Sequence, residues 1–94
     1  MDLVGKNVLE DCYRRHPDAR SYMEVLVLEI EDAAWKTPHD LKGKYPKASL
    51  IGKNVVYLDV MGNRFRMAIK VDYRNQCVIV QKAGSHKEYD TWSL

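Results

Sequence analysis

The sequence predicts an α+β fold in which helices from the N-terminal part pack on one face of an antiparallel sheet of three or four strands. The first observation is the period of the apolar residues, which is helical in the first half and becomes two from about residue 50. The second is a pair of polar turns that separates β-rich segments. A chain of 94 residues supports one hydrophobic core, so we expect a single domain over residues 1–94.

Two helices are expected before residue 36. The segment Asp2–Val4 has the composition of a short edge strand, and Gly5 then releases the chain into a helix. His16 precedes a proline and is therefore disfavoured in the helical region, so the first helix should end there. A second helix is predicted over about 18–35. Its apolar stripe comprises Ala19, Tyr22, Met23, Leu26, Ile30 and Ala33.

A short third helix is predicted after Thr37. Thr37 is a good N-cap residue, Pro38 suits the first helical position, and Asp40 stands three residues after the cap. Tyr45-Pro46 should end this helix. Strands separated by polar turns follow. We expect them at Val55–Val60, Arg64–Tyr73 and Cys77–Lys82.

The middle strand is predicted to have one apolar and one basic face. Its two sets of side chains alternate and therefore point to opposite faces of the sheet. The set expected to face the helices is Phe65, Met67, Ile69, Val71 and Tyr73. The opposite face, left for solvent or a ligand, should carry Arg64, Arg66 and Lys70.

Both hairpin registers can be predicted from the turns. If Gly62-Asn63 forms a two-residue turn, Asp59 lies opposite Arg66, where it would steady the guanidinium, and Tyr57 lies opposite Ala68. If the second hairpin turns about Asn75, three further pairs reach the same face. These pairs are Lys82 with Ala68, Gly84 with Arg66, and His86 with Arg64.

The segment Gly84–Asp90 is therefore expected on the basic face. His86 and Tyr89 are three residues apart and share one side of a helical turn if the tail curls after Gly84. Cleavage of an RNA phosphodiester requires removal of the 2′-hydroxyl proton, cationic stabilisation of the phosphate and protonation of the leaving 5′-oxygen. Histidine, lysine, arginine and tyrosine can fill these roles.

The same residues also have structural explanations. A strand face with alternating basic residues is often the solvent side of an antiparallel sheet. A histidine near the C-terminus is often a surface residue, and a tyrosine is often a core anchor. Trp35 is expected in the core, whereas Trp92 is a candidate for stacking on bases that lies near the terminus. His16 and His39 have no partner at metal-ligand spacing, and no metal or other cofactor is expected.

Charge is divided unevenly along the chain. Residues 1–40 carry five Lys/Arg and nine Asp/Glu, whereas residues 41–94 carry ten and four, which gives net charges of −4 and +6. The basic half is suited to attract phosphate. With no apolar run long enough to span a bilayer and no secretory pattern at the start, the expected compartment is the cytoplasm. Cys12 and Cys77 are expected to be structural.

Four segments, in order and over most of the chain, resemble the HigB branch of the RelE-like toxins. They are His16–Ala19, Trp35–Pro46 with Ala48-Ser49, Gly62–Met67 and Gly84–Asp90. The resemblance implies a RelE-like fold and cleavage of messenger RNA in the ribosomal decoding site, by attack of the 2′-hydroxyl on the adjacent phosphate without a metal ion. It also implies a HigA-type antitoxin with a helix-turn-helix, through which alone the toxin would meet DNA.

The resemblance further implies roles for individual residues. Arg66 would hold the scissile phosphate, and His86 and Tyr89 would handle protons or order the substrate. Ser85 stands where threonine is usual in the last motif, and it retains the hydroxyl. Around these residues, the side chains expected to bind RNA are Arg64, Lys70, Lys82 and Asp90.

Two other functions remain open at this point. A ParE-like toxin of the same superfold would bind DNA gyrase and have no nuclease activity, although such proteins generally lack the histidine–tyrosine ending. A non-enzymatic RNA-binding domain would use the basic sheet face for phosphate and Tyr57 or Trp92 for stacking, and would bind RNA without cutting it.

Overall fold

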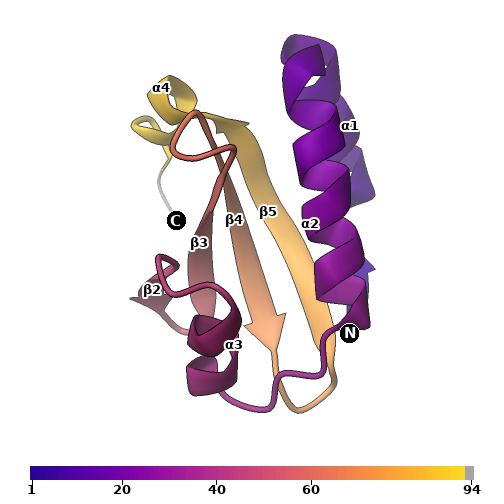
Figure 1. The fold of residues 1–94 in the computed structure, drawn as a ribbon, viewed down its shortest axis with the longest axis vertical. Coiled ribbons are helices and arrows are strands. Elements are labelled where there is room, and N and C mark those ends of the chain that lie inside the picture. Colours follow the sequence, from indigo (N-terminus) through magenta and orange to yellow (C-terminus); the bar gives the residue numbers. More distant parts are fainter. Residues whose placement is uncertain (93–94) are drawn as a thin grey trace.

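The computed structural model describes residues 1–92, in which helices lie against one face of a sheet (Figure 1). The α+β class is as predicted. The helices are α1 (Lys6–Arg15), the 3-10 turn η1 (Pro17–Ala19), α2 (Arg20–Asp32), α3 (Pro38–Lys44) and α4 (His86–Tyr89). The strands are β1 (Asp2–Val4), β2 (Ser49–Gly52), β3 (Val55–Val60), β4 (Phe65–Asp72) and β5 (Cys77–Ser85).

The sheet is larger than predicted and is mixed rather than antiparallel. Its five strands follow the order β1-β5-β4-β3-β2. The segment Asp2–Val4 forms an edge strand as expected, but it pairs in parallel with β5. A parallel pair requires a crossover connection, and here the whole helical region lies between the two strands. The other additional strand, β2, forms the opposite edge beside β3.

Helices α1, α2 and α3 enclose the main core against the sheet. The helices and the 3-10 turn contribute these residues to the core: Leu9, Cys12, Tyr13, Ala19, Met23, Leu26, Val27, Ile30 and Leu41. Two details of the second predicted helix were wrong. It ends at Asp32, because Ala33 has extended backbone dihedral angles. Tyr22 is exposed, because it is turned by about 100° around the helix from the buried Met23.

The connection to α3 follows the predicted capping. The Thr37 side chain accepts a hydrogen bond from the Asp40 backbone N–H at 3.2 Å, and Pro38 occupies the first turn. Trp35, just before this helix, is buried as expected.

Within residues 1–92, no helix has the length and apolar character needed to cross a membrane.

Both predicted hairpin registers are confirmed. Asp59 lies opposite Arg66 and Tyr57 opposite Ala68. In the second hairpin, Ala68 lies opposite Lys82 and Arg66 opposite Gly84. The register shifts between Ala68 and the next residue, and β5 continues to Ser85, three residues beyond its predicted end. The longer strand carries the chain to the place where α4 begins.

Replacing Gly5 with alanine is expected to destabilise the fold by about 2–4 kcal/mol. Gly5 has φ +99°, and a Cβ there would lie 2.6 Å from the Val80 carbonyl oxygen of β5. Both the left-handed backbone and this contact disfavour a side chain. Urea unfolding would measure the change. Gly43→Ala is a matched control, because Gly43 lies within α3 and a Cβ added there meets no other atom within 4 Å. This substitution should raise the free energy of unfolding by up to about 1 kcal/mol.

Candidate active site

Strand β4 holds Arg66 on the sheet face opposite the main core. Its neighbours Phe65 and Met67 belong to the core, and side chains alternate along a strand. The Arg66 Nε and Nη2 atoms lie 2.9 and 2.8 Å from Asp59 Oδ1, across the β3–β4 pair. The predicted contact between Asp59 and Arg66 is therefore present, and it holds the guanidinium in one orientation.

Helix α4 supplies the histidine and the tyrosine from a single turn. The Ser85 hydroxyl accepts from the Glu88 backbone N–H at 3.2 Å, and the Glu88 carboxylate accepts from the Ser85 N–H at 2.8 Å. This reciprocal capping box starts the helix at His86. The predicted curl after Gly84 is confirmed, and the rings of His86 and Tyr89 lie 5.4 Å apart, centre to centre.

The three predicted catalytic residues come together at this end of the sheet. The Arg66 guanidinium carbon lies 4.3 Å from the centre of the Tyr89 ring and 5.8 Å from that of Tyr57. Arg66 and Tyr89 are half-buried, whereas His86 is exposed. One cation, one imidazole and one phenol therefore share a small surface region, which Arg66, His86 and Tyr89 define and which we call the Arg66 site.

The sheet face around the Arg66 site is less open than predicted. Tyr57 retains only 8% of its exposure and Ala68 none. The Tyr57 ring packs edge-on against Tyr89 at 5.2 Å and against Trp92 at 6.2 Å, measured between ring centres. The C-terminal segment thus covers part of the face with its own aromatic rings, and Trp92 packs within the chain.

The four residues predicted to bind RNA lie in different places. The Arg64 Nη2 atom is 2.9 Å from Asp18 Oδ2 of η1, so this side chain is drawn toward the helical layer and away from Arg66. Arg64 belongs to the turn before β4, where the alternation of the strand does not extend. The other three are exposed, with Lys70 on β4, Lys82 on β5 beside Ala68, and Asp90 directly after α4.

Three residues next to the site were not predicted from the sequence: Glu88, Arg15 and His16. The Glu88 carboxylate pairs with the Arg15 guanidinium, and its Oε1 lies 2.6 Å from His16 Nε2. Ser85 and Glu88 have the spacing of a capping box, which is a recognisable signal in the sequence. The contacts with Arg15 and His16 join segments 73 and 72 residues away along the chain, and no local pattern reports such contacts.

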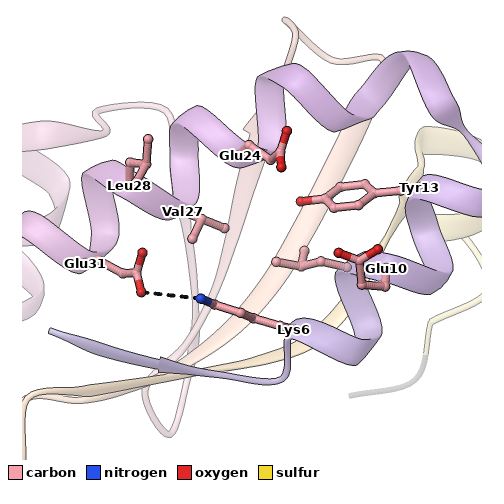
Figure 2. Close-up of a pocket in the computed structure, with 8 residues that line it drawn as sticks. Lys6, Glu10, Tyr13, Glu24, Val27, Leu28 and Glu31 are labelled. Atoms are coloured by element: carbon pink, nitrogen blue, oxygen red, sulfur yellow. Dashed lines mark ion pairs between the residues drawn. The ribbon is translucent and has the colours of Figure 1, made fainter.

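A second surface feature lies on the helical layer. A depression of about 490 Å³ between α1 and α2 is lined by Glu10, Tyr13, Glu24 and Glu31, and Lys6 pairs with Glu31 at its edge (Figure 2). Burial and the neighbouring carboxylates raise the pKa of the Tyr13 hydroxyl to about 12. The three carboxylates of this depression disfavour the binding of phosphate.

The Arg66 site has the groups that phosphodiester cleavage requires. A guanidinium can stabilise negative charge on a phosphate, and an imidazole can accept or donate a proton near neutral pH. A phenol can donate a hydrogen bond that orders the substrate. Among the described residues, no group of three or more His, Cys, Asp or Glu side chains is arranged to hold a metal ion.

Comparison with known proteins agrees with the resemblance. The chain is 27% identical over 92 residues to the mRNA interferase HigB of Escherichia coli O6:H1 (strain CFT073), covering 96% of this chain and 89% of that protein. It is 28% identical over 96 residues to the mRNA interferase toxin HigB of Escherichia coli K12 and to the mRNA interferase HigB of Shigella flexneri, covering 96% of this chain and 88% of each relative. The HigB toxin family model, described as the RelE-like toxic component of a toxin-antitoxin system, matches residues 19–92, and the chain therefore belongs to the HigB family.

Proposed function

We propose that this toxin is an mRNA interferase that cuts messenger RNA in the ribosomal decoding site. The observation that carries the proposal is the convergence of Arg66, His86 and Tyr89 at one end of the sheet. The names of the relatives, mRNA interferase HigB, support the same activity. Translating ribosomes are in the cytoplasm, and we expect the toxin to act there.

The proposed reaction needs no metal ion. The 2′-hydroxyl loses its proton and attacks the adjacent phosphorus, the bond to the 5′-oxygen breaks, and that oxygen takes up a proton. The products are a 2′,3′-cyclic phosphate and a 5′-hydroxyl end. Arg66 stabilises the phosphate, while His86 and Tyr89 transfer a proton or order the substrate. Asp59 holds Nε and Nη2 of Arg66 through one oxygen, which orients the guanidinium for this contact.

Ribosomes programmed with a defined message test this proposal directly. We expect a cut within the decoding site, with a cyclic phosphate on the upstream fragment and a 5′-hydroxyl on the downstream fragment. RNA binding without a cut would favour the non-catalytic RNA-binding domain. Inhibition of DNA gyrase without any RNA cleavage would favour the ParE-like function. Either result would reject the proposed activity.

Affinity for RNA is expected to fall steeply with salt. Phosphate contacts release counterions, and each contact with a single strand contributes a slope of about −0.7 in a plot of log K against log salt. Lys70 and Lys82 are exposed, whereas Arg64 and Arg66 already pair with carboxylates. We therefore expect a slope steeper than about −1, which Lys70→Ala should reduce by about 0.7. A binding constant that does not change with salt would contradict RNA binding through phosphate contacts on the basic sheet face.

An antitoxin of the HigA type, with a DNA-binding helix-turn-helix, is the proposed partner. Membership of the family supports a toxin–antitoxin pair. Tyr22, Val25 and Leu28 are exposed apolar side chains on α2, and such side chains are common at protein interfaces. The antitoxin either covers the Arg66 site or makes the toxin too large for the ribosome. Both routes predict that the complex does not cut ribosome-bound message, and cleavage by the intact complex would contradict both.

A further inference from the structure

The Glu88 side chain connects α4 to the end of α1. Its Oε1 accepts a hydrogen bond from the Ser85 N–H and lies 2.6 Å from His16 Nε2, and its Oε2 pairs with Arg15. Arg15 also donates to the Ala83 carbonyl oxygen at 3.2 Å. One carboxylate therefore joins the last strand, the one-turn helix and the segment that follows α1.

Helix α4 depends on such contacts for its position. It comprises only four residues, and an isolated helical turn is unstable because nucleation fixes several dihedral angles for one hydrogen bond. Tyr89 packs toward the sheet against Tyr57, and Glu88 reaches toward α1. Since His86 lies in the same turn as both, the two contacts together determine where its imidazole lies relative to Arg66.

Gly84 leaves the space that Glu88 occupies. A Cβ added to Gly84 would lie 2.7 Å from Glu88 Oε1 and 3.2 Å from its Cδ. Gly84 is buried and lies directly opposite Arg66 in the sheet. A methyl group at this position would push the carboxylate away from its partners without removing any charged group.

We propose that Glu88, held by Arg15 and His16, is a positioning residue that keeps His86 and Tyr89 in place beside Arg66. The proposal rests on the proposed RNA cleavage. It assigns Glu88 no contact with RNA, because its carboxylate is engaged by Ser85, Arg15 and His16. Loss of its contacts should therefore lower the rate of the chemical step more than the affinity for the programmed ribosome.

Single-turnover cleavage at saturating ribosomes tests this prediction with Glu88→Ala, Arg15→Ala and Gly84→Ala. Each variant should be at least about 10-fold slower with affinity changed by less than about 3-fold, since displacing a catalytic group by 1 Å can cost about 100-fold. Arg14→Ala is the matched control and should cleave at the wild-type rate. The Arg14 side chain is 77% exposed and pairs with Asp11 within α1.

Two further variants separate positioning from loss of stability. Glu88→Gln keeps the side-chain shape and suits a capping box, so it should recover much of the rate that Glu88→Ala loses. Adding Glu88→Ala to Gly84→Ala should cause little further loss, because both changes break the same contacts. Fully additive losses, or Arg15→Ala and Gly84→Ala enzymes at the wild-type rate, would overturn the proposal.

Hydrogen exchange of the peptide covering residues 84–92 gives a readout without cleavage. Exchange should accelerate in Arg15→Ala and Glu88→Ala but not in Arg14→Ala. Unchanged exchange in the first two variants would show that Glu88 does not hold α4, and the proposal would be wrong. If the wild-type protein cuts no RNA, the proposed function fails, while the exchange data still decide whether Glu88 positions the helix.

Discussion

Replacing Arg66 with alanine is expected to abolish growth arrest while the protein remains folded. The guanidinium is fixed by Asp59 and lies over the Tyr89 ring. In the proposed reaction it stabilises the charge that builds on the phosphate, and loss of one such donor typically lowers a rate by about 100- to 1,000-fold. Arg66 lies outside the core that the helices form with the sheet, so this core is retained.

Growth after induction and thermal unfolding together measure both parts of this prediction. Arg66→Lys retains a charge but cannot hold Asp59 through two nitrogens, so we expect an intermediate loss of toxicity. Arg74→Ala is the matched control, because Arg74 is an exposed arginine in the turn at the other end of β4. A folded Arg66→Ala protein that still arrests growth would remove Arg66 from the site.

The two hairpins were predictable because their information is local. Turn residues at Gly62-Asn63 and around Asn75, with strict alternation between them, determine which residues face each other. This register was sufficient to place Asp59 beside Arg66 from the sequence. The position of α4 was also predictable, since a curl of the chain after Gly84 was expected and the spacing of His86 and Tyr89 is that of a helical turn.

The remaining features depend on contacts that no local pattern encodes. The parallel pairing of β1 with β5 and the ion pair between Arg64 and Asp18 both join segments far apart in the sequence. The packing of Tyr89 and Trp92 over the Tyr57 ring also joins segments that are far apart in the sequence. Alternation predicts which side of a strand a residue occupies, but it does not predict which later segment covers that side.

This cover changes the interpretation of the Arg66 site. The sequence predicts a flat, solvated basic face, whereas the structure has a half-buried arginine enclosed by Asp59, Tyr57 and Tyr89. A guanidinium that keeps only 15% of its side-chain exposure is less screened by water than one on an open surface. In the proposed reaction, we therefore expect Arg66 to stabilise the charge on a single phosphate, and the exposed lysines to attract the RNA backbone.

His86→Ala and Tyr89→Phe are expected to differ in the size of their effect. Imidazole gains and loses a proton near neutral pH, whereas phenol keeps its proton there. His86 is the exposed member of the pair, so it can reach a bound substrate, while the Tyr89 ring packs against Arg66 and Tyr57. Tyr89→Phe keeps this packing and loses only the hydroxyl. We therefore expect His86 to take part in proton transfer and Tyr89 to order the substrate.

Single-turnover cleavage of message on a programmed ribosome separates the two roles. His86→Ala should be slower by about 100-fold or more, the usual contribution of a positioned acid or base, while Tyr89→Phe should lose about 10-fold or less. His39→Ala is the matched control, because His39 is exposed on α3 and should leave the rate unchanged. A His86→Ala rate equal to that of the wild type would exclude this histidine from the mechanism and leave Arg66 and Tyr89 as the candidates for catalysis.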